Sequence, residues 1–91
     1  MKSHTTEQFR TLLAALLPSV QQRARNACKL FKVNPTHPSL HFKPLHTKAK
    51  GSFYSVRIGI RYRALALREE DTLVWFWIGS HADYDALLSQ L

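Results

Sequence analysis

The sequence contains one cysteine, three glycines and no long apolar run. A single cysteine, Cys28, cannot form a disulfide within the chain, and such usage is typical of a reducing cytoplasm, where we expect this protein to act. No apolar run approaches the ~20 residues that a helix needs to cross a membrane. The first residues lack the apolar stretch of a signal peptide, so we expect no membrane partner. Ninety-one residues allow one domain, 1–91, with one modest core.

Acidic residues are almost missing from the first three quarters of the chain. Residues 1–68 hold all 13 Lys and Arg and a single acid, Glu7, which gives +12. Residues 69–91 hold five acids and no base, which gives −5, and the sum is the net charge of +7. So uneven a distribution indicates a polyanionic partner, either a nucleic acid or an acidic protein.

The histidines do not form a metal-binding pattern. His37, His41 and His46 are separated by three and four residues, with prolines nearby and no cysteine among them. This spacing fits no zinc site. We therefore expect no metal and no other cofactor, and we expect these three side chains to line the side that faces nucleic acid.

The stretch from Ser52 to His81 predicts three consecutive antiparallel strands. Side chains alternate in the first two strands, and Leu73–Ile78 is apolar throughout, as in a central strand covered on both sides. A three-residue loop at 59–61 pairs Ile58 with Tyr62 and Arg57 with Arg63, which keeps like residues on one face.

The same register predicts the two faces of the sheet. It places Val74, Phe76 and Ile78 beside the small Ala64 and Ala66, on a face suited to receive helices. The opposite face would be basic and aromatic, with Ser55, Arg57, Arg63, Leu65, Trp75 and Trp77.

Two helices are predicted before the strands. The first begins at Thr5, in a capping box that Gln8 closes. Pro18 interrupts the pattern, and Ser19 caps a second helix that ends near Val33, so the two form an antiparallel hairpin. One face of each helix is apolar: Phe9, Leu12, Leu13 and Leu16 in the first, Val20, Ala24, Ala27 and Phe31 in the second.

An edge strand over 40–45, a basic turn over 47–51 and a short helix over 81–91 complete the pattern. The predicted fold is α+β: an N-terminal helical hairpin packed on a small, curved, mainly antiparallel four-stranded sheet, with a short C-terminal helix.

Three segments, in this order, carry a family resemblance. They read N-P-T-H-P-S-L-H-F-K-P-L after the second helix, G-S-F-Y-S-V-R-I-G-I-R-Y-R-A-L in the hairpin, and W-F-W-I-G-S-H-A-D-Y-D at the end of the last strand. From about Glu7 to Leu88, the chain resembles the RelE/ParE superfamily of bacterial toxin–antitoxin toxins, and the closing Gly-x-His resembles its YafQ-like and HigB-like members.

The resemblance implies the toxin of a type II toxin–antitoxin system. Such a toxin would be a ribosome-dependent endonuclease that cleaves messenger RNA through attack by the ribose 2′-hydroxyl, without metal, and a cognate antitoxin would hold it silent. Two alternatives remain: a ParE-like inhibitor of DNA gyrase, and a RelE-like domain that binds RNA or protein without catalysis.

RNA cleavage of this kind needs proton transfer and stabilisation of a phosphorane. His81 is the candidate for proton transfer, because an imidazole can act as acid or base at neutral pH. Arg57 and Arg63 can bind a phosphate bidentately. Asp83 or Asp85 could orient the imidazole.

Tyr84 is a further candidate at the catalytic site, although its helical spacing with Leu87 and Leu88 also fits a core position. The candidate RNA-binding residues are Lys48, Lys50, Arg61 and Trp77. Trp77 could stack on a base, or it could belong to the core or to an antitoxin-binding surface.

One departure from the RelE pattern bears on the mechanism. The strand before the first arginine carries catalytic lysines in RelE, whereas the corresponding positions here hold Phe53 and Ser55. Cleavage would therefore depend on His81, and the same departure also fits a non-cutting member.

Overall fold

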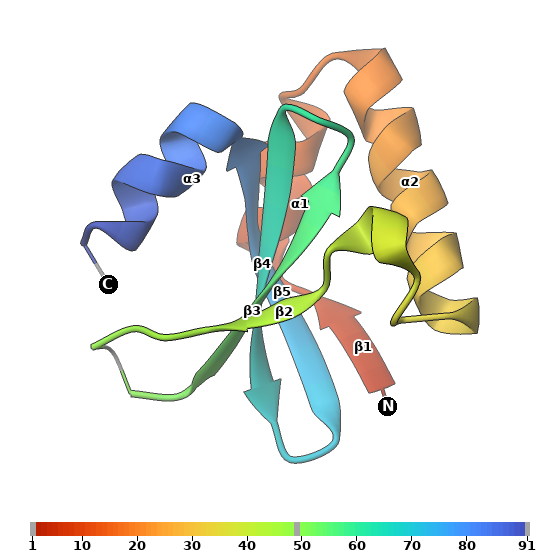
Figure 1. Ribbon diagram of the computed structural model, residues 1–91. Helices are drawn as coiled ribbons and strands as arrows, with labels where there is room; N and C mark the ends of the chain where they lie inside the picture. The colour runs from red at the N-terminus through yellow and green to blue at the C-terminus, as the bar shows by residue number, and fades with distance from the viewer. Residues whose placement is uncertain (1, 49, 91) are drawn as a thin grey trace.

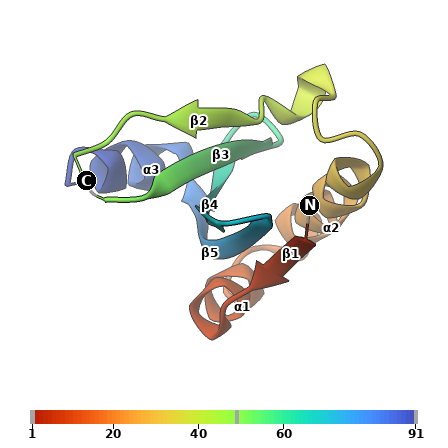
Figure 2. The ribbon, with the colours of Figure 1, turned by 90° about the horizontal axis from the view of Figure 1, so that it is seen from below.

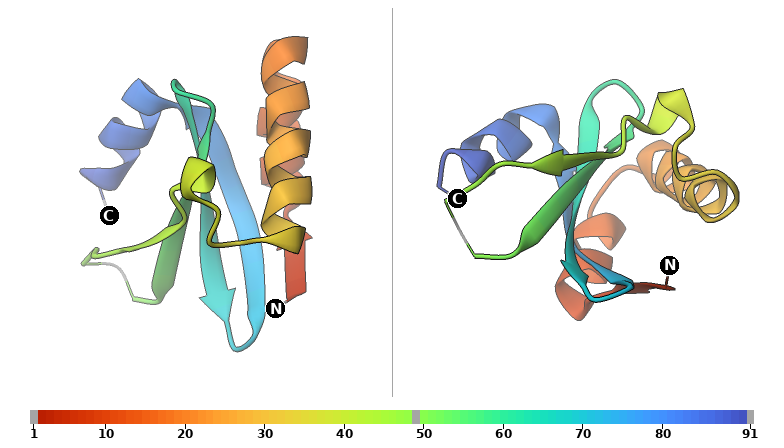
Figure 3. Two further views of the ribbon diagram at one scale, coloured as in Figure 1. Left: turned by 45° about the vertical axis from the view of Figure 1, so that its right-hand side comes forward. Right: turned by 60° about the horizontal axis from the view of Figure 1, so that its bottom comes forward.

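The computed structural model describes residues 2–48 and 50–90, which form a mixed sheet between helices (Figure 1). In chain order the elements are β1 (Lys2–Thr5), α1 (Glu7–Ala14), α2 (Pro18–Val33), the 3₁₀ helix η1 (Pro38–Leu40), β2 (Lys43–Leu45), β3 (Ser52–Ile58), β4 (Tyr62–Glu69), β5 (Thr72–Ser80) and α3 (His81–Leu88). The strand order is β1-β5-β4-β3-β2, with β1 parallel to β5 and all other pairs antiparallel. The helical hairpin α1–α2 and the helix α3 lie on opposite sides of the sheet (Figures 2 and 3). No helix of these two described stretches is long and apolar enough to cross a membrane.

The register of the β3–β4 hairpin is the predicted one. Ile58 pairs with Tyr62 and Arg57 pairs with Arg63 across a three-residue loop. Gly59 opens this loop with φ of 64°, in the left-handed region that glycine adopts at no steric cost. The two arginines therefore share one face of the sheet.

The predicted face of Ile78 is right, but those of Val74, Trp75 and Phe76 are wrong, because a β-bulge interrupts the β4–β5 ladder. Leu65 pairs with Trp77 and the next residue, Ala66, pairs with Trp75, so Phe76 is the extra residue between the two tryptophans. A bulge shifts the alternation by one residue. Trp75 therefore lies on the face of the helical hairpin, where its ring packs edge-on against Phe31 at 5.7 Å between centroids.

The other face is not the open basic and aromatic surface that the sequence predicts. Ser55 and Leu65 are 1% and 0% exposed, because α3 packs over this side of β4 and β5. Tyr84 of α3 is also buried and packs against Trp77, with 6.4 Å between ring centroids. Only the turn end of this face keeps its arginines half-exposed.

The sheet has five strands rather than four, since the first residues form β1. Lys2 pairs with Thr72 and Thr5 with Trp75, and α1 then begins at Glu7 instead of Thr5. The N-cap is Thr6, whose Oγ1 accepts a hydrogen bond from the Phe9 N–H at 3.1 Å. With Thr6 as the N-cap, the third helical residue is Phe9 and not Gln8, so the predicted capping box does not form.

The second helix, in contrast, begins slightly earlier than predicted. Pro18 is its first residue and Leu17 its N-cap, so Ser19 lies inside the helix. Proline is favoured there because the first helical N–H has no intrahelical partner. The helix ends at Val33, as predicted, and Val20 and Ala24 are its buried residues.

The predicted edge strand is shortened, because its first residue belongs to η1 and His41 adopts a left-handed conformation with φ of 45°. Leu40 is buried in the core, and Pro44 lies in edge strand β2 as predicted. The core between the hairpin and the sheet consists of Ala24, Leu40, Val56, Ile58, Ala64 and Ile78.

Candidate functional site

Arg57 and Arg63 extend along the turn end of the sheet. Nε of Arg57 donates to the Gly59 carbonyl at 3.0 Å. Nη1 of Arg63 donates to the carbonyls of Ile60 and Tyr62 at 3.2 and 2.8 Å. Backbone oxygens of the β3–β4 turn thus hold both guanidinium groups, and no carboxylate neutralises either within the described residues.

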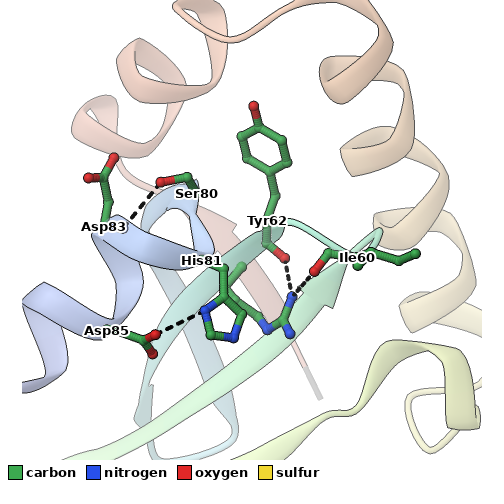
Figure 4. A network of polar contacts seen from close by, with 7 residues as sticks. Ile60, Tyr62, Ser80, His81, Asp83 and Asp85 are labelled. Atoms are coloured by element: carbon green, nitrogen blue, oxygen red, sulfur yellow. Dashed lines mark hydrogen bonds and ion pairs between the residues drawn. The ribbon is translucent and has the colours of Figure 1, made fainter.

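His81 is the first residue of α3 and is fixed to the same turn. Its backbone N–H donates to the Arg61 carbonyl at 2.7 Å. The preceding residue, Ser80, is the N-cap, and its Oγ accepts a hydrogen bond from the Asp83 N–H at 3.1 Å. Two hydrogen bonds therefore hold the start of the helix, and Figure 4 shows the one between Ser80 and Asp83.

The imidazole of His81 has a carboxylate partner. Nδ1 lies 3.0 Å from Oδ2 of Asp85, one helical turn further on, and the His81 side chain is 49% exposed (Figure 4). A carboxylate at Nδ1 favours the proton on that nitrogen and leaves Nε2 free to accept another. Of the two acids considered from the sequence, Asp85 is the one that contacts the ring.

The strand register places the histidine and the arginines at one end of the sheet. Arg63 pairs with Gly79 and Tyr62 pairs with Ser80, so His81 follows directly beyond these pairs. The arrangement combines a proton acceptor with two fixed cations. These are the groups that a phosphoryl transfer without a metal requires.

Tyr84 packs edge-on against the imidazole. Its ring is 6% exposed, with its centroid 6.0 Å from that of His81 and 6.4 Å from that of Trp77. Trp77 itself is half-buried on this face. Tyr84 thus contacts the His81 ring, and Trp77 packs behind Tyr84.

The candidate RNA-binding residues do not all gather at the site. Arg61 lies exposed in the β3–β4 turn, directly beside His81. Lys48 and Lys50 are exposed in the β2–β3 connection, at the opposite end of β3 (Figure 1). Seven residues of β3, roughly 20 Å at ~3.3 Å per residue, separate this connection from the turn.

His41 is a site residue whose position the sequence did not reveal. Its Nε2 lies 3.4 Å from Nη1 of Arg57, which can donate to it. The left-handed backbone at His41 brings the ring beside the arginine. From the sequence, His41 was expected only on the side that faces nucleic acid.

The two positions that depart from the RelE pattern cannot transfer protons to a substrate in this conformation. Phe53 packs edge-on against Phe76, with 5.9 Å between ring centroids. Ser55 is 1% exposed, and its Oγ has no hydrogen-bond partner among the described residues. Within the same residues no group of three or more His, Cys, Asp or Glu could hold a metal ion.

Comparison with known proteins relates this architecture to bacterial and archaeal toxins. Residues 18–86 match the ParE-like toxin domain family. The fold is similar to YafQ from Escherichia coli BL21(DE3), with a TM-score of 0.71 and 14% identity over 91% of this chain and 96% of that one. It is also similar to the RelBE2 toxin–antitoxin complex from Mycobacterium tuberculosis (TM-score 0.69, 22% identity, 88% and 96% covered).

A further similar structure is the RelE–RelB complex from Pyrococcus horikoshii OT3, with a TM-score of 0.67 and 13% identity over 87% of this chain and 92% of that one. Comparison with curated proteins finds no match. The predicted α+β class agrees with these structures, although the sheet has one more strand than predicted.

Proposed function

Because this chain belongs to the ParE-like toxin domain family, within the RelE/ParE superfamily of toxins, we propose that it is a type II toxin that cleaves messenger RNA on the ribosome. The observation that supports cleavage most directly is the His81–Asp85 pair beside the turn that holds Arg57 and Arg63.

In the proposed reaction, Nε2 of His81 takes the proton of a ribose 2′-hydroxyl. The 2′-oxygen then attacks the adjacent phosphorus, the P–O5′ bond breaks, and the departing 5′-oxygen receives the proton from the imidazole. The products are a 2′,3′-cyclic phosphate and a 5′-hydroxyl. Arg57 and Arg63 stabilise the charge of the phosphorane, and Asp85 stabilises the imidazolium.

Tyr84 and Trp77 support the imidazole in this proposal, and Arg61 contacts the RNA backbone from the turn. Lys48 and Lys50 bind phosphates further along the RNA. Their distance from the β3–β4 turn, roughly 20 Å along β3, spans several nucleotides. These contacts require no metal or cofactor.

The proposed protein partner is a cognate antitoxin with a short acidic segment that folds on binding. Residues 1–68 carry +12, which favours such a segment. Two of the similar structures are complexes of a toxin with its antitoxin, RelE–RelB and RelBE2.

Induced expression in a bacterial host tests the proposal. Expression should halt growth and produce new transcript ends, and His81→Ala should abolish both. His4→Ala is the matched control, because His4 lies exposed on β1, the far edge strand. Growth arrest of equal strength with His81→Ala, in a protein that unfolds at the same temperature as the parent, would contradict the mechanism.

The ParE-like character of the matching family favours gyrase as a second candidate target. In that case, expression should relax DNA topology and induce a DNA-damage response while transcripts remain intact. A domain that binds RNA without catalysis would give salt-dependent RNA binding and no growth arrest.

A further inference from the structure

A cavity of about 270 Å³ lies between the helical hairpin and the sheet, on the face away from His81. Its walls are apolar and come from α1, α2 and the strands, including Phe9, Phe31, Ile58 and Trp75. Small side chains leave the space, since Ala24 and Ala27 of α2 and Ala64 of β4 also line it.

The mouth of the cavity is basic. Arg25, Cys28 and Lys32 of α2, with Ser3 and Thr5 of β1, are the lining residues that are exposed to solvent. No acidic residue occurs among the described residues that line the cavity. A ligand whose apolar part lies in the cavity would therefore contact two cations and two hydroxyls at the mouth.

We propose that this cavity binds a small anionic amphiphile, a medium-chain carboxylate whose apolar tail enters between α2 and the sheet while its head group pairs with Arg25 and Lys32. The charge of the mouth selects the anion, and the apolar wall selects the tail. This site is separate from the proposed nuclease site and does not depend on that proposal.

The size of the cavity fits a ligand of this class. An apolar cavity of ~150 Å³ holds a benzene molecule, so about 270 Å³ accommodates roughly ten heavy atoms. Octanoate, with ten heavy atoms, is a suitable probe. Two hydrogen-bonded or ionic contacts at the mouth and a buried alkyl chain should give a Kd on the order of 0.1 mM or tighter.

The two tryptophans offer an internal comparison. Trp75 lines the cavity, and its Nε1 donates to the Ser3 Oγ at 2.7 Å near the mouth. Trp77 packs with Tyr84 on the opposite face. In a nitrogen–proton correlation spectrum of the full chain, octanoate should shift the indole signal of Trp75 saturably and leave that of Trp77 in place.

Two pairs of variants test the position of the ligand and the role of its charge. Ala27→Leu fills the cavity and should weaken octanoate binding at least tenfold, whereas Ala14→Leu, on the exposed side of α1, should not. Arg25→Gln with Lys32→Gln should weaken octanoate about tenfold and leave 1-octanol unchanged. Arg23→Gln with Lys29→Gln removes equal charge from α2 outside the cavity and should leave both probes unchanged.

The proposal fails if octanoate gives no saturable shift up to about 1 mM, or if Ala27→Leu binds it as the parent does. It also fails if the Arg25 and Lys32 changes weaken octanoate no more than their control. Should Ala27→Leu not fold, intermolecular nuclear Overhauser effects between octanoate and the Ile58 and Ala64 methyls of the parent protein decide the position. Their absence in a saturated sample would overturn the assignment.

Discussion

Nδ1 of His81 and Oδ2 of Asp85 lie 3.0 Å apart, one turn from each other along α3. The carboxylate orients the imidazole and stabilises the imidazolium that forms when Nε2 accepts a proton.

Asp85→Asn should therefore lower the rate of mRNA cleavage in a translation extract at least tenfold, because it removes part of the ~10²–10⁴-fold that a well-oriented acid–base group contributes. Asp83→Asn is the control, because Asp83 occupies the same helix and its backbone, not its carboxylate, makes the capping bond. Equal loss in the two variants would show that only the acidity of the helix start matters.

The arginine pair gives a second prediction. Arg57→Gln or Arg63→Gln should each reduce cleavage about 10²-fold, because a fixed donor that faces developing charge contributes on that order. Arg68→Gln, further along β4 and exposed, should leave the rate within about twofold. Arg63→Lys should cleave little faster than Arg63→Gln, since one ammonium cannot reproduce the bidentate geometry of a guanidinium. Full activity in Arg63→Lys would indicate a general electrostatic role.

The packing of Trp77 over Gly79 gives a prediction about stability. A Cβ at position 79 would lie 2.6 Å from the indole Cζ2 of Trp77, and the rigid ring would have to leave its place beside Tyr84. Gly79→Ala should lower the free energy of unfolding by about 1–3 kcal/mol, measured by denaturant titration.

Trp77→Leu provides the matched background for that experiment. With the indole gone, the Gly79→Ala change should lower stability much less, because the two effects share one contact. Additive losses would show that position 79 acts through its backbone instead.

The cap of α3 gives the fourth prediction. Ser80→Ala removes the acceptor of the Asp83 N–H and should lower the free energy of unfolding by about 1 kcal/mol. Amide exchange within α3 should accelerate with it. Ser80→Asp keeps a side-chain oxygen at the N-cap and should retain the stability of the parent. Equal exchange rates in the Ala and Asp variants would argue against the cap.

The β3–β4 hairpin could be predicted from the sequence because one register alone satisfies both its alternation and its turn. Pairing Arg57 with Arg63 keeps polar and apolar sets apart, and Gly59 supplies the positive φ that the loop requires. The position of the arginines followed from this local information.

The bulge in β5 could not be predicted in the same way. Residues 73–78 are all apolar, so a shift by one residue places an apolar side chain on either face. Burial alone does not choose between Trp75 and Phe76 for the hairpin side. The choice depends on tertiary packing, including the Trp75 contact with Phe31.

β1 was missed for a related reason. Lys2–Thr5 is polar and exposed, so it carries no hydrophobic alternation. It pairs with the edge of β5, whose residues lie far along the chain. The local sequence does not reveal that edge. The contact of His41 with Arg57 is equally non-local, since it joins positions 16 residues apart through a left-handed turn.

The parallel pairing of β1 with β5 joins residues that are far apart in synthesis, Lys2 with Thr72 and Thr5 with Trp75. At ~5–20 residues per second, the roughly 60 residues between α1 and β5 take about 3–12 s to emerge. For that time the apolar side of α1 lacks β5, the strand against which it packs. Until β5 is synthesised, the nascent chain can be bound by chaperones or can aggregate. The rate of translation through the second half of the chain therefore affects the fraction of molecules that reach the folded state.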